Sequence, residues 1–287
     1  MSGTGPIAIV TGASRGAGRG IATALGRHGC TVYVTGRSEK VGDTSAPGTI
    51  YATADEVTAA GGKGIAVRVD HADDAQVEAL FDQVRAEQGR LDILVNNACA
   101  IHDQLTAPGH FWQKPLAIGD MINVGVRSGF VASWYAAPLM VDQGKGLIIF
   151  TSASGSVHYV FGPAYGAHKA GVDKMAADMA VDLREANVAA LSIWMGALAT
   201  ERLLAMIAAH PIKYGHLAEA LETPEFTGHI VWALFNDPDL MALSGQTVIG
   251  AEMGRRYGVA DQGGKVPTSV RDTLGIAPHL PHPHIIR

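Results

Sequence analysis

The 287-residue sequence has few cysteines, few charged residues and no long hydrophobic run. Its two cysteines, Cys30 and Cys99, are too few for a disulfide framework or a cysteine-rich zinc cluster, and they fit a reducing compartment. No run of apolar residues is long enough to cross a bilayer, and the first apolar run starts at Ile7 without a leader before it. We therefore expect a cytoplasmic protein without a membrane span.

An excess of positive charge is absent as well. The net charge is −5, whereas a general nucleic-acid binder needs a basic face, so we expect no nucleic-acid partner. The twelve histidines include His279, His282 and His284, which lie among prolines near the C-terminus. Such a tail is more often solvated than metal-binding, and we expect no metal site. Hydrophobic residues make up 47% of the chain, which is enough for a large buried core.

Glycine, in contrast, is plentiful, and its 35 residues stand mostly at the ends of apolar runs. Short β-branched runs alternate with helical patterns, which predicts an α/β domain with a mainly parallel, seven-stranded sheet covered by helices on both faces. We expect one domain over 1–260 with all sites, and a loosely packed Gly/Pro/His-rich tail over 261–287. The expected strands are 6–11, 31–36, 63–70, 91–97, 146–152, 188–194 and 245–250; the expected helices are 18–29, about 52–60, 73–89, 115–143, 163–186, 200–220 and 224–235, with a looser stretch at 38–50.

The turn "TGASRGAGRG" (11–20) lies between the first expected strand and the first expected helix. Glycines allow a tight turn there and a close approach of the backbone, and the helix start offers N–H groups to a phosphate. The spacing is G-x-x-x-G-x-G, and its position predicts a dinucleotide site. The predicted cofactor-binding residues of this turn are Gly12, Ser14, Arg15, Gly16, Ala17 and Gly18.

The choice of dinucleotide depends on the end of the second expected strand, "VTGRS". An acid at this place favours NAD, but the chain has Gly36 followed by Arg37. Arg15 adds a second guanidinium, and two guanidiniums favour the 2′-phosphate of NADP(H). The alternative is that both arginines are solvated surface residues and that the enzyme depends on NAD(H).

The stretch "YGAHK" (165–169) places a tyrosine four residues before a lysine, a spacing that chance alone can supply. Together with "TGASRGAG", "NNA" (96–98), "TSASG" (151–155) and "GALAT" (196–200), it resembles the short-chain dehydrogenase/reductase family over residues 6 to about 252. The segments "GRLDILVNNA", "SIWMG" and "GRRYG" are similar to the dehydrogenase/reductase member 1 subgroup of that family. The resemblance implies a single Rossmann-type three-layer domain and an NADP(H)-preferring oxidoreductase acting on a small-molecule carbonyl or alcohol.

The resemblance implies four catalytic residues. Tyr165 acts as the acid/base, and Lys169, one helical turn on, brings a positive charge that favours the phenolate. Ser152, thirteen residues before Tyr165, hydrogen-bonds the substrate oxygen, and Asn123 anchors a water that passes protons to Lys169. The further cofactor-binding residues it implies, besides Tyr165 and Lys169, are Asp70, His71, Asn97, Ala98, Gly196, Leu198 and Thr200.

Two residues depart from the family pattern: Cys99 stands where a glycine is usual, and Met195 where a proline is usual. Both are predicted to line the substrate pocket, together with His158 and Leu203 of an apolar lid within about 197–222, so a hydrophobic substrate is expected. The apolar stretch 131–140 predicts a homodimer or homotetramer. A catalytically silent nucleotide-binding sensor or scaffold is the alternative from another class.

Overall fold

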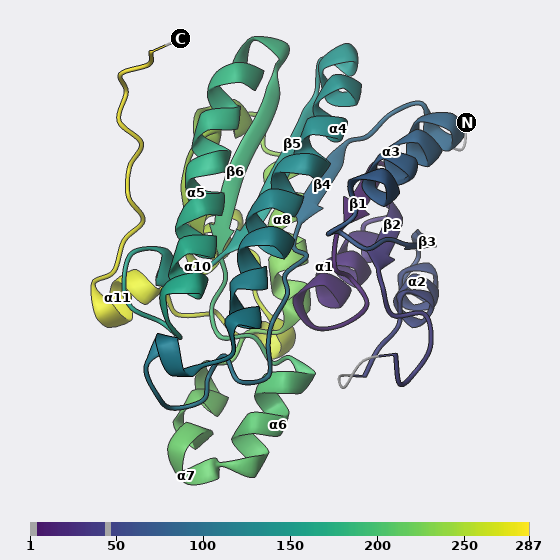
Figure 1. Cartoon of the computed structure of the whole chain (residues 1–287). Helices are drawn as coiled ribbons and strands as arrows, with labels where there is room; N and C mark the ends of the chain where they lie inside the picture. The colour runs from purple at the N-terminus through teal and green to yellow at the C-terminus, as the bar shows by residue number, and fades with distance from the viewer. Residues whose placement is uncertain (1–4, 44–46, 287) are drawn as a thin grey trace.

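Seven parallel strands form one sheet in the order β3-β2-β1-β4-β5-β6-β7 (Figure 1), which confirms the predicted fold class. The computed structural model describes residues 5–43 and 47–286; the centre of the stretch 38–50 and the last residue of the tail lie outside the described residues. The strands are β1 (Ile7–Val10), β2 (Thr31–Gly36), β3 (Lys63–Arg68), β4 (Ile93–Asn96), β5 (Gly146–Ser152), β6 (Val188–Trp194) and β7 (Thr247–Ile249).

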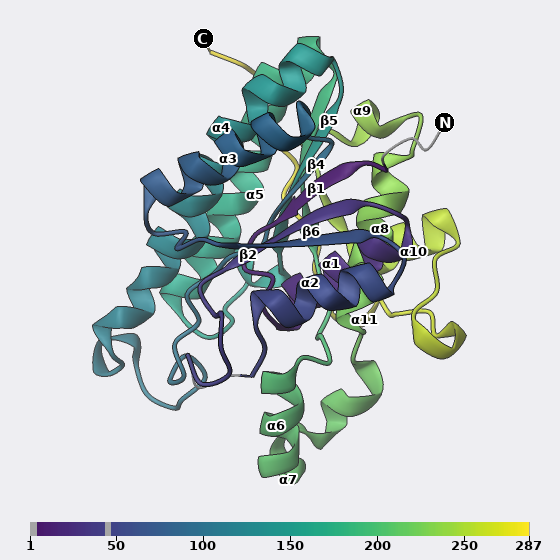
Figure 2. The same cartoon turned by 90° about the vertical axis from the view of Figure 1, so that its right-hand side faces the viewer.

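Alternate residues of each central strand face two separate apolar cores, one on each side of the sheet. In β1, Ala8 and Val10 belong to one core, and Ile7 and Ile9 belong to the other. Helices cover both faces (Figure 2). The first core lies beneath α1 (Gly16–Arg27), α2 (Ile50–Ala59) and α8 (Pro224–Phe235), and the second lies beneath α3 (Asp74–Gln88), α4 (Ser128–Gln143) and α5 (Pro163–Leu183).

The ends of the helices follow from local chemistry. The side chain of Asp73 accepts hydrogen bonds from the backbone N–H groups of Ala75 and Gln76, which caps the start of α3. Gly89 ends the same helix with a φ of 68°, a conformation in which glycine carries no steric penalty. At the carboxyl end of the sheet, α6 (Glu201–Ala209) and α7 (Pro211–Tyr214) project away from the sheet (Figures 1 and 2).

The single helix expected over 115–143 is wrong, because the chain is broken there into three parts. A short 3₁₀ helix at Leu116–Gly119 comes first, a π-helical segment at Ile122–Arg127 follows, and only then does α4 begin. Val124 and Gly125 leave the helical conformation, and the Val124 carbonyl accepts a hydrogen bond from Ala100 N at 2.9 Å. This contact with the loop after β4 is tertiary, so no helical pattern in the sequence reveals it.

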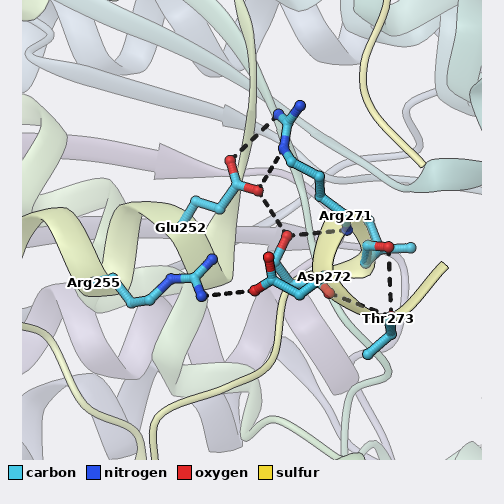
Figure 3. A network of polar contacts seen from close by, with 7 residues as sticks. Glu252, Arg255, Arg271, Asp272 and Thr273 are labelled. Carbon is cyan, nitrogen blue, oxygen red and sulfur yellow. Dashed lines mark hydrogen bonds and ion pairs between the residues drawn. The ribbon is translucent and has the colours of Figure 1, made fainter. Parts of the chain in front are cut away.

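The tail is better packed at its start than the sequence predicts. After β7 the chain forms α10 (Gly250–Tyr257), which was not expected, and α11 (Val270–Leu274). Two ion pairs join these helices, Arg271–Glu252 and Arg255–Asp272 (Figure 3). The fully buried hydroxyl of Ser269 also donates to Glu252 at 2.7 Å. From residue 279 to residue 286 every residue of the tail is exposed. Among the described residues, no helix is long and apolar enough to span a membrane.

Candidate active site

A cavity of about 640 Å³ opens at the carboxyl ends of the strands. This edge is where ligands bind in parallel α/β sheets, because the helix N-termini and the loops meet there. The cavity brings together 17 of the residues that the sequence predicted for the cofactor, the catalytic groups and the substrate: Gly12, Ser14, Arg15, Gly16, Ala17, Gly18, Arg37, Asp70, His71, Asn97, Ala98, Cys99, Tyr165, Lys169, Met195, Leu198 and Thr200.

Five of the predicted residues do not line the cavity: Asn123, Ser152, His158, Gly196 and Leu203. Two of them lie directly behind its wall. Ser152 is fully buried, and its hydroxyl donates to the Lys169 carbonyl at 3.4 Å. Gly196 comes immediately after Met195, and its backbone N–H donates to the Glu222 carboxylate.

The phosphate turn is built by close backbone contacts between the first and fourth strands. Gly12 has a φ of +64°, and a Cβ at this position would lie 2.7 Å from the Ala98 Cα. The Thr11 hydroxyl accepts hydrogen bonds from the backbone N–H groups of Asn97 and Ala98, both at 2.9 Å, and the Asn97 amide donates to the Thr11 carbonyl at 2.9 Å. Glycine is therefore required at position 12, and the two turns form one rigid wall.

An anionic group already contacts the start of α1. The backbone N–H of Gly16 donates to a Glu201 carboxylate oxygen at 3.2 Å, and Arg19 pairs with the other oxygen at 3.2 Å. Unpaired N–H groups and the positive end of the dipole favour negative charge at a helix N-terminus. The turn therefore binds an anion in the place where a cofactor phosphate is predicted. Glu201 belongs to no motif in the sequence and was not predicted, although it directly follows the predicted cofactor residue Thr200.

Two arginines lie at the same end of the cavity as the glycine turn. The guanidinium of Arg15 donates to the Ser38 hydroxyl at 2.5 Å and to the Gly48 carbonyl at 3.1 Å. Burial lowers the pKa of Arg15, and the nearby positive charge of Arg37 lowers it further. Arg37 lies 3.8 Å from a carboxylate oxygen of Asp70. The positive charges of Arg15 and Arg37 are thus close together, and the carboxylate of Asp70 lies beside Arg37.

His71 is a neutral group in the same part of the wall. Its Nε2 lies 2.8 Å from the Thr35 hydroxyl, and burial lowers its pKa to about 4. Its Nδ1 has no hydrogen-bond partner among the described residues. A buried polar atom without a partner is costly unless a ligand or water completes it, so His71 offers a hydrogen bond to a bound group.

Tyr165 and Lys169 meet at the opposite end. The Lys169 ammonium donates to the Thr151 carbonyl at 3.1 Å and lies 5.7 Å from the centre of the Tyr165 ring. Burial, with a smaller contribution from Cys99, raises the pKa of Tyr165 to about 12. Burial also lowers the pKa of Lys169, so desolvation governs both groups of the pair in the described protein. Tyr165 is protonated at neutral pH.

Asn123 does not line the cavity beside Tyr165 and Lys169. It is exposed on the π-helical segment, whereas Gly125 of the same segment is buried and faces His168. A Cβ at position 125 would lie 2.9 Å from the His168 Nε2. The break in the helix thus turns Gly125, not Asn123, toward α5. The large side chain of His168 inside "YGAHK" could have predicted a glycine opposite it, because its ring leaves no room for a Cβ at position 125.

Cys99 and His168 form a contact beside the Tyr165–Lys169 pair. The Cys99 sulfur lies 3.5 Å from the His168 Nδ1. Burial raises the pKa of Cys99, although the positive charge of Lys169 opposes this rise. Burial also lowers the pKa of His168 to about 3. Both groups are therefore neutral near pH 7, and Cys99 lacks the thiolate character of a reactive thiol.

The segment after β4 supplies an apolar part of the cavity wall, through Ile101, Ala117 and Met121. Met121 belongs to a small core cluster with Leu105 and Ile118, against which Cys99 and Tyr165 pack. In contrast, α6 buries none of its residues, and its Glu201 and Arg202 line the cavity instead of Leu203. His158 contacts the Ser154 hydroxyl at 3.0 Å outside the cavity. The loop 99–114 was expected to contact substrate, but it carries no regular pattern, so the sequence alone did not reveal which of its side chains line the cavity.

With this geometry in view, the comparisons with known proteins place the chain in a family. The short chain dehydrogenase model matches residues 6–208, and the chain belongs to this family of oxidoreductases. Among its relatives, Dehydrogenase/reductase SDR family member 1 of Homo sapiens is 39% identical, with 97% of this chain and 89% of the relative covered. These findings confirm both resemblances stated from the sequence.

More distant members share the same fold. The 3-oxoacyl-acyl-carrier-protein reductase of a Synechocystis species is 32% identical, with 85% of this chain and 94% of the relative covered. The crystal structure of a putative dehydrogenase from Xanthomonas campestris matches with a TM-score of 0.76 at 26% identity and covers 92% of this chain and 93% of that one. The similarity therefore extends well beyond the glycine turn and the Tyr–Lys pair.

Proposed function

We propose that the protein is an NADP(H)-dependent carbonyl reductase or alcohol dehydrogenase with Tyr165 as its acid/base. One observation carries the proposal: a single cavity is lined at one end by the glycine turn and two arginines and at the other end by Tyr165 and Lys169. A dinucleotide needs a phosphate site and a reaction site at the two ends of one continuous cleft.

The residues at the cofactor end fit such a group. The N–H of Gly16 already donates to an anion, the Glu201 carboxylate, and the His71 Nδ1, which has no partner among the described residues, can form a hydrogen bond to a bound group. Arg15 and Arg37 would hold a 2′-phosphate through charge-assisted hydrogen bonds. The nicotinamide of the bound cofactor supplies or accepts the hydride. Leu198 and Thr200, in the turn after β6, also line the cavity and would contact the bound cofactor.

At the reaction end, the protonated phenol of Tyr165 donates its proton to the oxygen of a carbonyl substrate. Lys169 supports this step because its buried positive charge stabilises the phenolate that remains. The apolar cluster of Leu105, Ile118 and Met121 beside Tyr165 favours a hydrophobic carbonyl or alcohol. The Ser152 hydroxyl donates to the Lys169 backbone carbonyl. We therefore propose that Ser152 supports the position of Lys169 and does not contact the substrate directly.

A Tyr165→Phe variant tests the reaction. We expect it to oxidise NADPH with hydrophobic aldehydes or ketones at a rate lowered by roughly 100-fold or more, because general acid catalysis is lost. It retains nucleotide binding, since the ring stays in place. Steady-state absorbance at 340 nm measures the rate, and Tyr159→Phe, at a tyrosine that is 79% exposed, is the matched control. Binding of NADPH by the wild type without turnover of any carbonyl would instead favour a silent nucleotide sensor.

An Arg37→Ala variant tests the cofactor preference. We expect the dissociation constant for NADPH to rise by about tenfold or more and that for NADH to change little, because only NADPH carries the 2′-phosphate. Fluorescence titration of both nucleotides gives the two constants. Arg68→Ala, at an arginine that pairs with Glu39 and does not line the cavity, is the control. Equal affinity of the wild type for the two nucleotides would favour the NAD(H)-dependent alternative.

A further inference from the structure

The segment after β6 that faces the reaction end of the cavity is held from behind by a second segment. Ala199 N donates to the Glu222 carbonyl, and Glu222 N donates to the Ala197 carbonyl, both at 2.8 Å. These bonds form a short parallel bridge between Leu198 and Glu222. We call residues 221–223 the strap. Because Leu198 lines the cavity, the strap sets the position of a part of the cavity wall.

The side chain of Glu222 adds a polar contact to this bridge. It is only 2% exposed, and its carboxylate accepts a hydrogen bond from the Gly196 N–H at 3.0 Å. A Cβ at position 196 would lie 2.4 Å from the other carboxylate oxygen. Glycine at position 196 and glutamate at position 222 therefore fit each other. Burying a carboxyl group lowers the stability of the folded state, so the presence of Glu222 here indicates a role other than stabilising the fold.

The beginning of the tail fixes the strap on its far side. The buried carboxylate of Asp261 accepts hydrogen bonds from Thr223 N at 2.7 Å and from the Thr223 hydroxyl. The Lys265 ammonium donates to the carbonyls of Glu219 at 2.6 Å and Leu221 at 2.7 Å. The cavity wall, the strap and the tail thus form three layers in which each is bonded to the next.

We propose that Glu222 is a positioning residue, which holds the segment 196–200 in the geometry that binds the nicotinamide end of the cofactor. The proposal rests on the proposed function, because it names a further residue of the same site. Glu222 touches neither cavity nor cofactor, and it acts through the backbone of Gly196 and through the bridge at Leu198.

The position also makes cofactor binding sensitive to pH. Burial raises the pKa of Glu222 to about 7; the Gly196 hydrogen bond and the Lys265 charge oppose the rise, and the Asp261 charge adds to it. A bound dinucleotide brings phosphate charge to the same cavity, and negative charge disfavours the ionised carboxyl. The cofactor therefore binds better to the protonated form, and its affinity falls as pH rises through about 7.

The test compares the wild type with Glu222→Gln, Glu222→Ala and the exposed control Glu219→Gln. The dissociation constant for NADPH is measured by fluorescence titration between pH 6 and pH 8.5. The 2′-phosphate itself titrates near pH 6, but it does so in every variant, so the ratio between variants isolates Glu222. Hydrogen exchange of the backbone amides of Gly196, Ala197 and Ala199 without nucleotide provides a second readout.

We expect Glu222→Ala to weaken NADPH binding by about tenfold, since the bond to Gly196 is lost. Glu222→Gln keeps an oxygen for that bond, so it restores affinity, and its advantage over the wild type grows roughly threefold to tenfold from pH 6 to pH 8.5. Amide exchange at 196–199 becomes faster in Glu222→Ala and stays slow in Glu219→Gln.

Unchanged NADPH affinity and amide exchange in Glu222→Ala would overturn the positioning role while leaving the proposed function intact. If Glu222→Ala does not fold, a pH dependence in Glu222→Gln identical to that of the wild type overturns the pH-sensitive part, and backbone amides of Gly196 and Ala199 that exchange in the wild type as fast as unprotected amides overturn the positioning. A wild-type protein that binds neither NADPH nor NADH would overturn the proposed function, and with it the role of Glu222.

Discussion

At the scale of single residues, the phenol of Tyr165 is governed by its burial more than by its charged neighbour. Its pKa is raised to about 12, so the phenol that we propose as the proton donor for reduction is protonated at neutral pH. The proton acceptor for oxidation is the phenolate, and its population increases as pH rises toward that pKa. The two directions of the reaction must therefore respond to pH in different ways.

We predict that alcohol oxidation becomes faster from pH 6 to pH 9, by up to about tenfold per pH unit, whereas carbonyl reduction does not require acid in this range. Steady-state rates in both directions at saturating cofactor measure the two profiles. His71 and His168 do not contribute, since burial holds their pKa values at about 4 and about 3. An oxidation rate that falls between pH 6 and pH 9 would contradict the assignment of Tyr165.

Some residues of the site could be predicted because the requirement they meet is local. Gly12 must adopt a positive φ within the short turn 11–15, and Arg37 directly follows a strand, so the neighbouring sequence reveals both. Asn123 and Glu222 lack such a signal. The orientation of Asn123 depends on the contact between Val124 and Ala100, and the role of Glu222 depends on a partner 26 residues earlier in the chain, at Gly196.

At the scale of elements, α6 and α1 meet at the phosphate turn. The first residue of α6, Glu201, places its carboxylate on the N–H of Gly16 and beside Arg19, both of α1. A cofactor phosphate at this turn would have to share these donors with Glu201 or displace it. The two helices are therefore linked by a contact that competes with the ligand.

A Glu201→Gln variant removes this competing charge. We predict that it binds NADPH about threefold to tenfold more tightly than the wild type, because a phosphate gains the N–H of Gly16 without displacing a carboxylate. Titration at low salt measures the gain, and Glu185→Gln, at an exposed acid outside the cavity, provides the comparison. Equal or weaker binding by Glu201→Gln would show that the carboxylate does not compete.

The boundaries of several elements were predictable, and those of others were not. The strands β5 and β6 and the helix α8 begin and end where the sequence predicts, because largely apolar runs, Pro224 at a helix start and flanking turn residues define them. The helix expected over 115–143 has the right composition, but Ala100 takes the carbonyl of Val124 and breaks it. Tertiary hydrogen bonds of this kind override helix propensity.

At the scale of the whole molecule, one face of α4 carries large apolar side chains that the fold leaves uncovered. Phe130 is 50% exposed, Trp134 is 61% exposed and Val141 is 42% exposed. The first two are four residues apart and share a side of the helix, where such a patch is typical of a surface between subunits. We propose that this face joins two copies of the chain.

We predict that light scattering finds a homodimer or homotetramer and that Trp134→Asp raises its dissociation constant by about 30-fold or more, since a central aromatic residue is replaced by a charge. Ile212→Asp, at a fully exposed residue of α7, leaves assembly unchanged. A monomeric wild-type protein, or equal assembly of the two variants, would exclude this face as the interface.

The bonds between Asp261 and the strap have a consequence for the order in which the protein matures. The cavity wall at 196–200 rests on residues 221–223, which in turn rest on Asp261, a residue that follows the last strand of the sheet. A nascent polypeptide on the ribosome therefore exposes the glycine turn long before the opposite wall is secured. We expect the site to be complete only after Asp261 has been synthesised, so a truncation before Asp261 would yield a folded sheet with an unfinished site.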